Sequence, residues 1–427
     1  MISNETDFDL LERIRKKEHV ENPFKRFNLS RNPFPKSAVA DSTSERFFSR
    51  CRKKALEQMR DFIVYVYASR RWAGLVLKGE IGSGKSHMLF YVASEITRQL
   101  GELEKDRALA VYVESPKDSI NDLYQDIMEK LGRDFFEAKV AAAIEEKAEK
   151  ILKNLPRQYF LPTTEVIPQD PLYRLRKMGK GIGESLKDKA LNDLAKELSN
   201  ERLVQHRDFA RCLGILAVDD DQEKRNAAWN FCIGKAISKT EAKGLGLVSE
   251  KLSEDEIVRY VFPSLIQILN KNGVGVVFLL IDEVEKIATM PTRRTFAFLE
   301  NLRSLVDNNL SGLCIIFSCL AESWDILAST SPALSDRMSE IVDLDPLDSK
   351  DTILLIEDYL KVARINPNQG KPLSPFDEAA VGKINLDSKG SIRYILQNCN
   401  TVLEHAALHP EIKDKISTQF VEKILGA

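Results

Sequence analysis

Short, continuous apolar runs alternate with segments of helical periodicity in the first third of the chain and again after residue 250. Runs of this length without polar alternation are typical of strands covered on both faces. Strands are predicted at residues 73–78, 107–114, 274–281, 313–317 and 341–344. Helices are predicted at residues 43–71, 87–100, 119–131, 253–269 and 291–310. This alternation predicts an α/β fold with a doubly wound parallel sheet.

Three segments depart from this alternation. Residues 1–45 are polar and contain two Asn-Pro-Phe triplets, which predicts an extended arm. Residues 133–250 have helical periods at 135–155, 186–198 and 201–217 and no predicted strand, so we expect a long helical insertion. After Ser349 only helices are predicted. We therefore expect an arm at 1–45, a core at 46–345 interrupted by the insertion at about 133–250, and a helical lid at 346–427.

A glycine-rich segment, residues 79–86, lies between a predicted strand and a predicted helix. It completes the pattern G-x-x-x-x-G-K-[S/T] with Gly79, Gly84, Lys85 and Ser86, and we call it the phosphate loop. Its N–H groups and the following helix N-terminus can surround phosphate oxygens. Lys85 is expected to reach the β- and γ-phosphates of ATP, and the Ser86 hydroxyl to hold Mg²⁺. The predicted nucleotide contacts are Gly79, Glu80, Ile81, Gly82, Ser83, Gly84, Lys85, Ser86 and His87.

Two carboxylates, Asp282 and Glu283, directly follow the apolar run 274–281. Charge at the tip of a buried strand is costly unless it is paired or bound to a metal. Because the chain also has a phosphate loop, we interpret Asp282 as a Mg²⁺ ligand and Glu283 as the base that activates the attacking water. Glu285 is the next candidate for the base. The alternative is that both carboxylates simply begin a solvated loop.

The net charge of −2 gives no global attraction to nucleic acid or to a membrane, so any such contact has to be local. A basic stretch inside the insertion contains Arg174, Arg176, Lys177 and Lys180. It is interpreted either as a loop that contacts nucleic-acid phosphates or as a solvated turn between helices.

The six cysteines form no C-x-x-C pair and are expected to be buried thiols in a reducing compartment. The five histidines show no spacing typical of a metal site. The first residues do not resemble a secretory signal, and no apolar run is long enough to span a bilayer. We expect a cytoplasmic protein with no membrane partner.

With these motifs in this order, the chain resembles the AAA+ ATPases. Ser318, at the end of the run 314–318, matches sensor 1, a polar residue that contacts the γ-phosphate or the attacking water. The nearby Cys319 and Glu322 are alternatives for this role. The resemblance covers roughly residues 45–115 and 255–405, and its specific motifs are the phosphate loop and the two carboxylates.

The same resemblance implies roles for two arginines. Arg337 matches the position from which an arginine finger reaches the nucleotide of a neighbouring subunit; the alternative is a local pair with Asp336. Arg393, in the segment 390–393, resembles sensor 2, through which the lid contacts the γ-phosphate. The alternative for Arg393 is an exposed helix arginine.

Within AAA+, the Asn-Pro-Phe arm and the spacing of Phe298, Leu302 and Asp307 resemble the origin-recognition and transposon-regulator branch and the P-loop proteins of BREX-like anti-phage systems. In that branch the arm borders the adenine, which implies base contacts by Phe34 and Pro35. Origin-binding members also carry a winged helix after the lid. The segment after Arg393 is too short for one, so sequence-specific duplex recognition is not expected.

The resemblance implies a Mg²⁺-dependent ATPase that acts as a homo-oligomer in a DNA or RNA transaction, such as mobile-element control or anti-phage defence. The alternative is a slow nucleotide-gated switch that recruits a protein effector through the helical insertion. Glu283 beside Asp282 favours hydrolysis. The near-neutral charge favours a protein partner.

Overall fold

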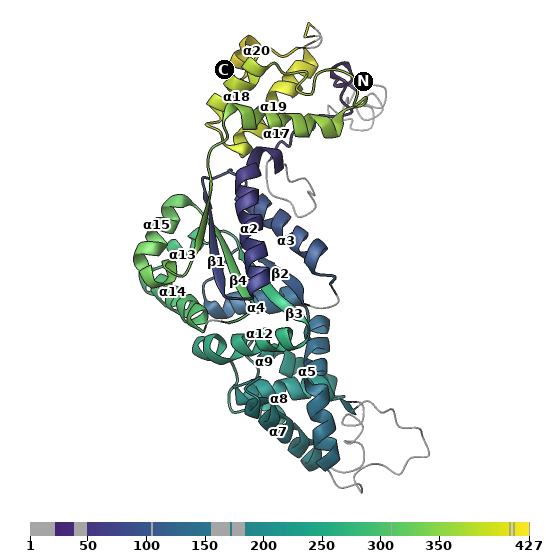
Figure 1. Cartoon of the computed structure of the whole chain (residues 1–427), viewed down its shortest axis with the longest axis vertical. Coiled ribbons are helices and arrows are strands. Elements are labelled where there is room, and N and C mark those ends of the chain that lie inside the picture. The colour runs from purple at the N-terminus through teal and green to yellow at the C-terminus, as the bar shows by residue number, and fades with distance from the viewer. Residues whose placement is uncertain are drawn as a thin grey trace, which may run out of the picture. The chain divides into compact units, whose positions relative to one another are not determined.

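The computed structural model describes residues 22–37, 49–103, 106–154, 171–172, 184–308, 310–409, 411–412 and 415–426 (Figure 1). These residues form two compact units. We call the first the sheet unit; it comprises Gln58–Lys78 and Met88–Asp343. The second, the lid unit, takes its described residues from Met1–Glu57, Gly79–His87 and Leu344–Ala427. The phosphate loop therefore groups with the C-terminal helices.

Five strands form one sheet in the order β2-β3-β4-β1-β5. Their bounds are β1 (Ala73–Gly79), β2 (Arg107–Val113), β3 (Val274–Ile281), β4 (Leu313–Cys319) and β5 (Glu340–Leu344). The pairs β1–β4, β4–β3 and β3–β2 are parallel, and every residue of β3 and β4 is buried. All five predicted strands are confirmed, with small differences at their ends. Continuous apolar sequence marks the central strands because both of their faces are covered.

Helices lie on both sides of the sheet, with α13 to α15 on one side and α2 and α3 on the other (Figure 1), which confirms the doubly wound architecture. They are α2 (Lys53–Ser69), α3 (Lys85–Leu100), α4 (Ile120–Leu131), α12 (Phe262–Lys271), α13 (Glu285–Ala288), α14 (Thr292–Asp307), α15 (Ala321–Thr330) and α16 (Pro332–Ser335). A capping box formed by Ser253 and Glu256 opens α11 (Glu254–Glu256) at the start of the helix predicted at 253–269. A π-helical turn, η5 (Ile257–Val261), then leads into α12. The hydrophobic periodicity predicted one continuous helix here and did not reveal this turn.

The insertion is helical, as predicted, and no strand occurs in the described part of 133–250. Its helices are α5 (Arg133–Asn154), α7 (Glu184–Asn200), α8 (Arg207–Val218), α9 (Gln222–Cys232) and α10 (Lys239–Leu245). The helix predicted from residue 201 is wrong in its start, because Arg202 has a positive φ of 56° and the His206 side chain caps α8. The basic stretch of Arg174, Arg176, Lys177 and Lys180 lies outside the described residues.

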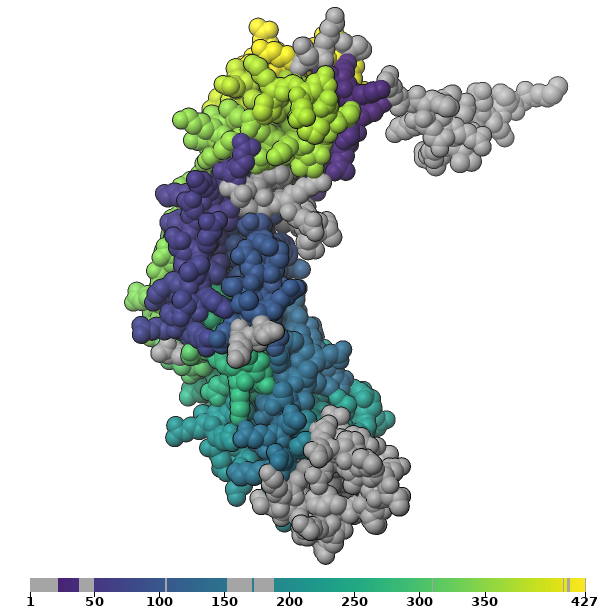
Figure 2. Space-filling view, turned by 45° about the vertical axis from the view of Figure 1, so that its right-hand side comes forward, coloured from purple at the N-terminus to yellow at the C-terminus, as the bar shows by residue number. Residues whose placement is uncertain are grey.

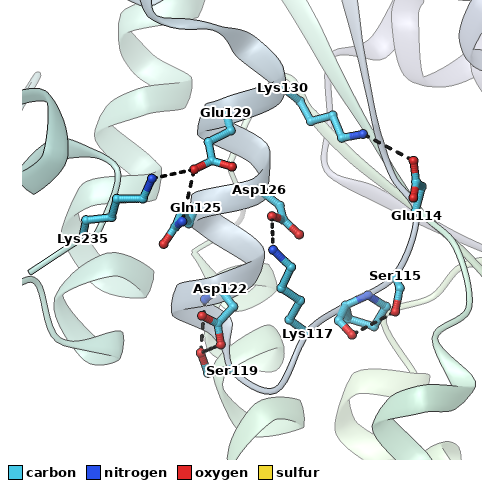
Figure 3. Close-up of polar contacts among 11 residues, drawn as sticks. Glu114, Ser115, Lys117, Ser119, Asp122, Gln125, Asp126, Glu129, Lys130 and Lys235 are labelled. Carbon is cyan, nitrogen blue, oxygen red and sulfur yellow. Dashed lines mark hydrogen bonds and ion pairs between the residues drawn. The ribbon is translucent and has the colours of Figure 1, made fainter.

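Contacts with α4 attach the insertion to the rest of the sheet unit. The buried Tyr124 hydroxyl donates to the Cys232 carbonyl at 2.9 Å. On the polar face of α4, Lys235 of the insertion pairs with Glu129 at 2.9 Å (Figure 3). Exposed ion pairs add little stability each, so the buried tyrosine is the stronger attachment.

The lid unit contains η1 (Lys25–Phe27), η2 (Ser49–Arg52), α17 (Ser349–Ala363), α18 (Glu378–Asp387), α19 (Ile392–Leu408) and α20 (Thr418–Leu425). The described arm, residues 22–37, packs against these helices (Figure 2) and is not a free extended segment. In both Asn-Pro-Phe triplets the Asn side chain accepts from the Phe N–H, at 3.0 Å in the first and 3.1 Å in the second. These Asx turns aim the phenylalanines at the lid.

Two expectations from composition can be compared with the structure. All six cysteines are buried and no disulfide joins any two of them, as predicted. Within the described ranges, no helix combines the length and the apolar character needed to cross a bilayer.

Candidate functional site

Lys85, the first residue of α3, folds its side chain back over the phosphate loop. Its Nζ donates to the carbonyl oxygens of Gly79 at 2.7 Å and Glu80 at 3.1 Å, and the residue is only 9% exposed. The ammonium is therefore held at the loop, where a phosphate oxygen could take over one of these bonds. Ser86 and His87 follow in the first turn of α3 and are half-buried.

The lid contacts the loop backbone from the other direction. The Arg393 N–H donates to the Gly82 carbonyl at 3.2 Å, and the Ser391 hydroxyl donates to the Ile81 carbonyl at 3.4 Å. Because a trans peptide places its C=O and N–H on opposite sides, these bonds turn the following N–H groups away from the lid contacts. Gly82 has a φ of 78°, and an added Cβ would lie 2.7 Å from Arg393 and Ser391 atoms. Only glycine fits at this position.

A cavity of about 460 Å³ lies beside the loop within the lid unit. Glu80, Ile81 and Ser83 of the loop line one part of it, and Gly390 and Tyr394 of the lid line another. The Tyr394 ring is 52% exposed and so remains accessible. A cavity next to a phosphate loop is the expected place for the rest of a nucleotide.

Asp282 follows β3 directly and is 2% exposed. Its Oδ2 accepts from the Tyr112 hydroxyl at 2.9 Å, and its Oδ1 accepts from the Ser318 hydroxyl and from the Glu283 N–H, the latter at 2.9 Å. Tyr112 and Ser318 lie on β2 and β4, the two neighbours of β3. Two donors on the adjacent strands and the N–H of the next residue thus orient one buried carboxylate.

This arrangement fits a hard cation. An ionised carboxylate has about four lone-pair positions, and the three donors leave one for a metal ion or for water bound to it. Carboxylate oxygens such as those of Asp282 are ligands that Mg²⁺ prefers. Within the part of the chain that the structure describes, no cluster of three or more His, Cys, Asp or Glu side chains offers another metal site.

Tyr112 is a site residue that the sequence analysis missed. Burial, reinforced by the Asp282 carboxylate, holds the pKa of the Tyr112 phenol well above its ordinary value, so the phenol stays protonated and donates. Its ring packs on Phe90, with centroids 4.1 Å apart. No local signal marks Tyr112, because its role depends on the pairing of β2 with β3.

Glu283 has a φ of 51°, a left-handed conformation that is uncommon for residues other than glycine. The following N–H, of Val284, donates to the Ser318 carbonyl at 3.0 Å and fixes the turn. The Glu283 side chain is 46% exposed and pairs with Lys286 Nζ at 2.5 Å. Unusual backbone conformations of this kind concentrate at functional sites.

The remaining candidates make contacts of their own. Arg337 pairs with Asp307, not with Asp336, and donates to the Ala333 carbonyl at 2.5 Å. The Arg393 side chain is exposed, and only its backbone is seen bonded to the loop. Of the alternatives to Ser318, Cys319 is buried and Glu322 is exposed.

Phe34 is 3% exposed and packs on Tyr359, with ring centroids 5.7 Å apart, inside the core of the lid unit. Its ring is thus engaged in lid packing and is not presented for contact with an adenine. Pro35 is half-buried beside it.

A phosphate loop after β1, a buried Asp followed by Glu after β3, a polar residue ending β4 and a helical lid define a P-loop protein of the AAA+ arrangement. The family model described as BREX system ATP-binding protein BrxC/D matches residues 52–350. The chain belongs to this family of BREX system ATP-binding proteins.

Among solved structures, the ORC2 protein of Aeropyrum pernix, determined as ADPNP–ADP complexes, is similar to this chain. The match has a TM-score of 0.42 and 10% sequence identity, and it covers 88% of this chain and 67% of that one. A comparison with curated proteins gives no match.

Replacing Tyr112 by Phe should weaken the binding of MgATP about tenfold, because a hydrogen bond to a charged group contributes about 1.5–3 kcal/mol and its loss lets Asp282 reorient. The ring contact with Phe90 remains. Titration of ATP with Mg²⁺ and with a chelator measures the effect. Affinity for metal-free ATP should be unchanged. The control is Tyr65→Phe, since Tyr65 is 58% exposed. Equal MgATP affinity in both variants would remove Tyr112 from the site.

Proposed function

We propose that this protein is a Mg²⁺-dependent ATPase that works as a homo-oligomer in a DNA or RNA transaction of BREX anti-phage defence. The observation that carries this proposal is the buried Asp282 carboxylate, oriented by three donors and followed by Glu283 in a left-handed conformation. A residue pair built in this way is expected where a metal-bound triphosphate meets a water molecule.

In this proposal the residues of the phosphate loop bind the β- and γ-phosphates through N–H groups and through Lys85. Ser86 and Asp282 would hold Mg²⁺, which when bound would neutralise the charge on these phosphates. Ser318 acts through Asp282, because its hydroxyl donates to that carboxylate. Glu283 accepts a proton from the attacking water. The exposed Arg393 side chain contacts the γ-phosphate from the lid.

A slow nucleotide-gated switch is the second candidate function, and one observation favours it. The Glu283 carboxylate is engaged by Lys286 at 2.5 Å. A carboxylate held in an ion pair is less free to turn toward an attacking water molecule than an unpaired one. If that pair persists with ATP bound, turnover is slow and the bound nucleotide instead controls contact with a protein effector.

Replacing Glu283 by Gln should leave ATP binding intact and slow hydrolysis by about 10²- to 10⁴-fold, because the general base is lost. Single-turnover hydrolysis with saturating MgATP measures this. Glu285→Gln is the matched control and should hydrolyse ATP at the wild-type rate. If the two variants behave in the opposite way, the base is Glu285.

The same assay separates the two candidate functions when Lys286 is replaced by Met. An ATPase in which the ion pair breaks on ATP binding should show an unchanged rate. A switch restrained by that pair should hydrolyse ATP about tenfold faster once the pair is removed.

Replacing Arg337 by Ala should abolish ATPase activity without loss of ATP binding, because an arginine finger stabilises charge only in the transition state. Mixing Arg337→Ala with Lys85→Ala protein should restore part of the activity, since each variant supplies the half-site that the other lacks. Specific activity is measured against protein concentration.

The matched control is Arg303→Ala, because Arg303 pairs with the same Asp307 at 2.9 Å. The Arg303→Ala variant shows how much ATPase activity changes when only the ion pairs of Asp307 are disturbed. Wild-type activity per molecule that stays constant down to concentrations with only monomer would contradict the oligomeric part of the proposal.

A further inference from the structure

Arg52, the last residue of η2, is a buried charged residue of the lid unit. It is 8% exposed and, within the described ranges, forms no ion pair with a carboxylate. Arginine is rarely buried without such a partner. Burial lowers the pKa of the Arg52 guanidinium, because desolvation disfavours the charged form. The contacts of Arg52 therefore have to offset the free-energy cost of removing its charged guanidinium from water.

Those contacts are two backbone carbonyls from distant parts of the sequence. One terminal nitrogen donates to the Ser83 carbonyl at 3.0 Å, and the other donates to the Asp345 carbonyl at 2.5 Å. Ser83 belongs to the phosphate loop, and Asp345 follows β5 where the chain enters the lid. The planar guanidinium, with its fixed fork of donors, is suited to bridge two acceptors in this way.

The bond to Ser83 has a direct consequence for phosphate binding. Because the Ser83–Gly84 peptide is trans, a carbonyl held by Arg52 directs the Gly84 N–H to the opposite side. Gly84 has a φ of 96°, which a residue with a side chain adopts only with strain. Within the described residues this N–H has no protein acceptor, so it is available to a phosphate oxygen.

We propose that Arg52 is a positioning residue that fixes the Ser83–Gly84 peptide for phosphate binding and links it to Asp345 at the entry to the lid. This inference rests on the proposed ATP site. It adds a hydrogen-bonded connection through which phosphate binding at the loop affects the entry to the lid. When a phosphate binds the Gly84 N–H, the Ser83 carbonyl, the guanidinium and the Asp345 carbonyl are constrained together.

The test compares Arg52→Met and Arg52→Lys with Arg50→Ala. Arg50 lies on the same turn but is 47% exposed and pairs with Glu357 at 2.9 Å and Asp358 at 2.6 Å. ATP affinity is measured by titration after thermal melting shows which variants are folded. Arg52→Met should bind ATP at least about tenfold more weakly, and Arg50→Ala should bind it as the wild type does. Arg52→Lys keeps the charge but not the fork, so it should restore only part of the affinity.

Hydrogen exchange supplies a measurement that a purely structural role would not change. In the wild type, saturating ATP should slow amide exchange both in the phosphate loop and in residues 344–347. In Arg52→Lys at saturating ATP, the loop should still be protected while residues 344–347 lose most of that protection.

Two results would overturn the inference: Arg52→Lys and Arg52→Met binding ATP within twofold of the wild type, or undiminished protection of residues 344–347 in Arg52→Lys. Either is distinct from failure of the proposed function, in which the wild type itself would bind no ATP. Loss of folding in Arg52→Met leaves the Arg52→Lys comparison decisive.

Discussion

A loop that binds phosphate has to turn several peptide N–H groups to one side, and the carbonyl oxygens on the other side then need donors of their own. In this protein those donors come from the lid unit. Ser391 and the Arg393 backbone serve Ile81 and Gly82, and Arg52 serves Ser83. The contact at the Ser83 carbonyl is buried, and a buried carbonyl without a donor costs about as much as a lost hydrogen bond. The shape of the loop therefore depends on the lid, which explains why the two form one compact unit.

The second constraint is the burial of a carboxylate at the end of β3. Asp282 is stable there because Tyr112, Ser318 and the Glu283 N–H all donate to it. Charge that is oriented in advance by neutral donors needs little rearrangement when a cation arrives. Two of these donors, Tyr112 and Ser318, come from the strands on either side of β3, so the parallel sheet itself builds this part of the site.

Local patterns predict the elements well where one physical cause dominates. The eight residues Val274–Ile281 are all apolar and all buried, so β3 has its predicted bounds. The helix predicted at 119–131 is α4, and its caps, Ser119 and Gly132, need only neighbours in sequence. The predicted start of α8, at residue 201, was wrong. The His206 side chain caps the helix, so α8 begins at Arg207 although apolar periodicity extends further back.

The residues of the candidate site likewise fall into those that local sequence predicts and those that depend on distant partners. The phosphate loop and Asp282-Glu283 are continuous motifs, so their residue types and spacing are sufficient to find them. Tyr112 and Arg52 act through partners more than 30 positions away, at Asp282, Ser83 and Asp345. The choice of Asp307 over Asp336 as the partner of Arg337 likewise depends on packing between helices. No single-sequence pattern encodes such contacts.

The central claim is that this chain binds ATP through Lys85 in the phosphate loop. The most direct measurement is the ATP affinity of the wild type, of Lys85→Ala and of Lys78→Ala, the last a lysine on β1 that pairs with Asp343 at 3.4 Å. The account predicts that the wild type and Lys78→Ala bind ATP alike and that Lys85→Ala loses at least about 100-fold, or about 2.7 kcal/mol. ATP affinity of Lys85→Ala equal to that of the wild type would contradict the account.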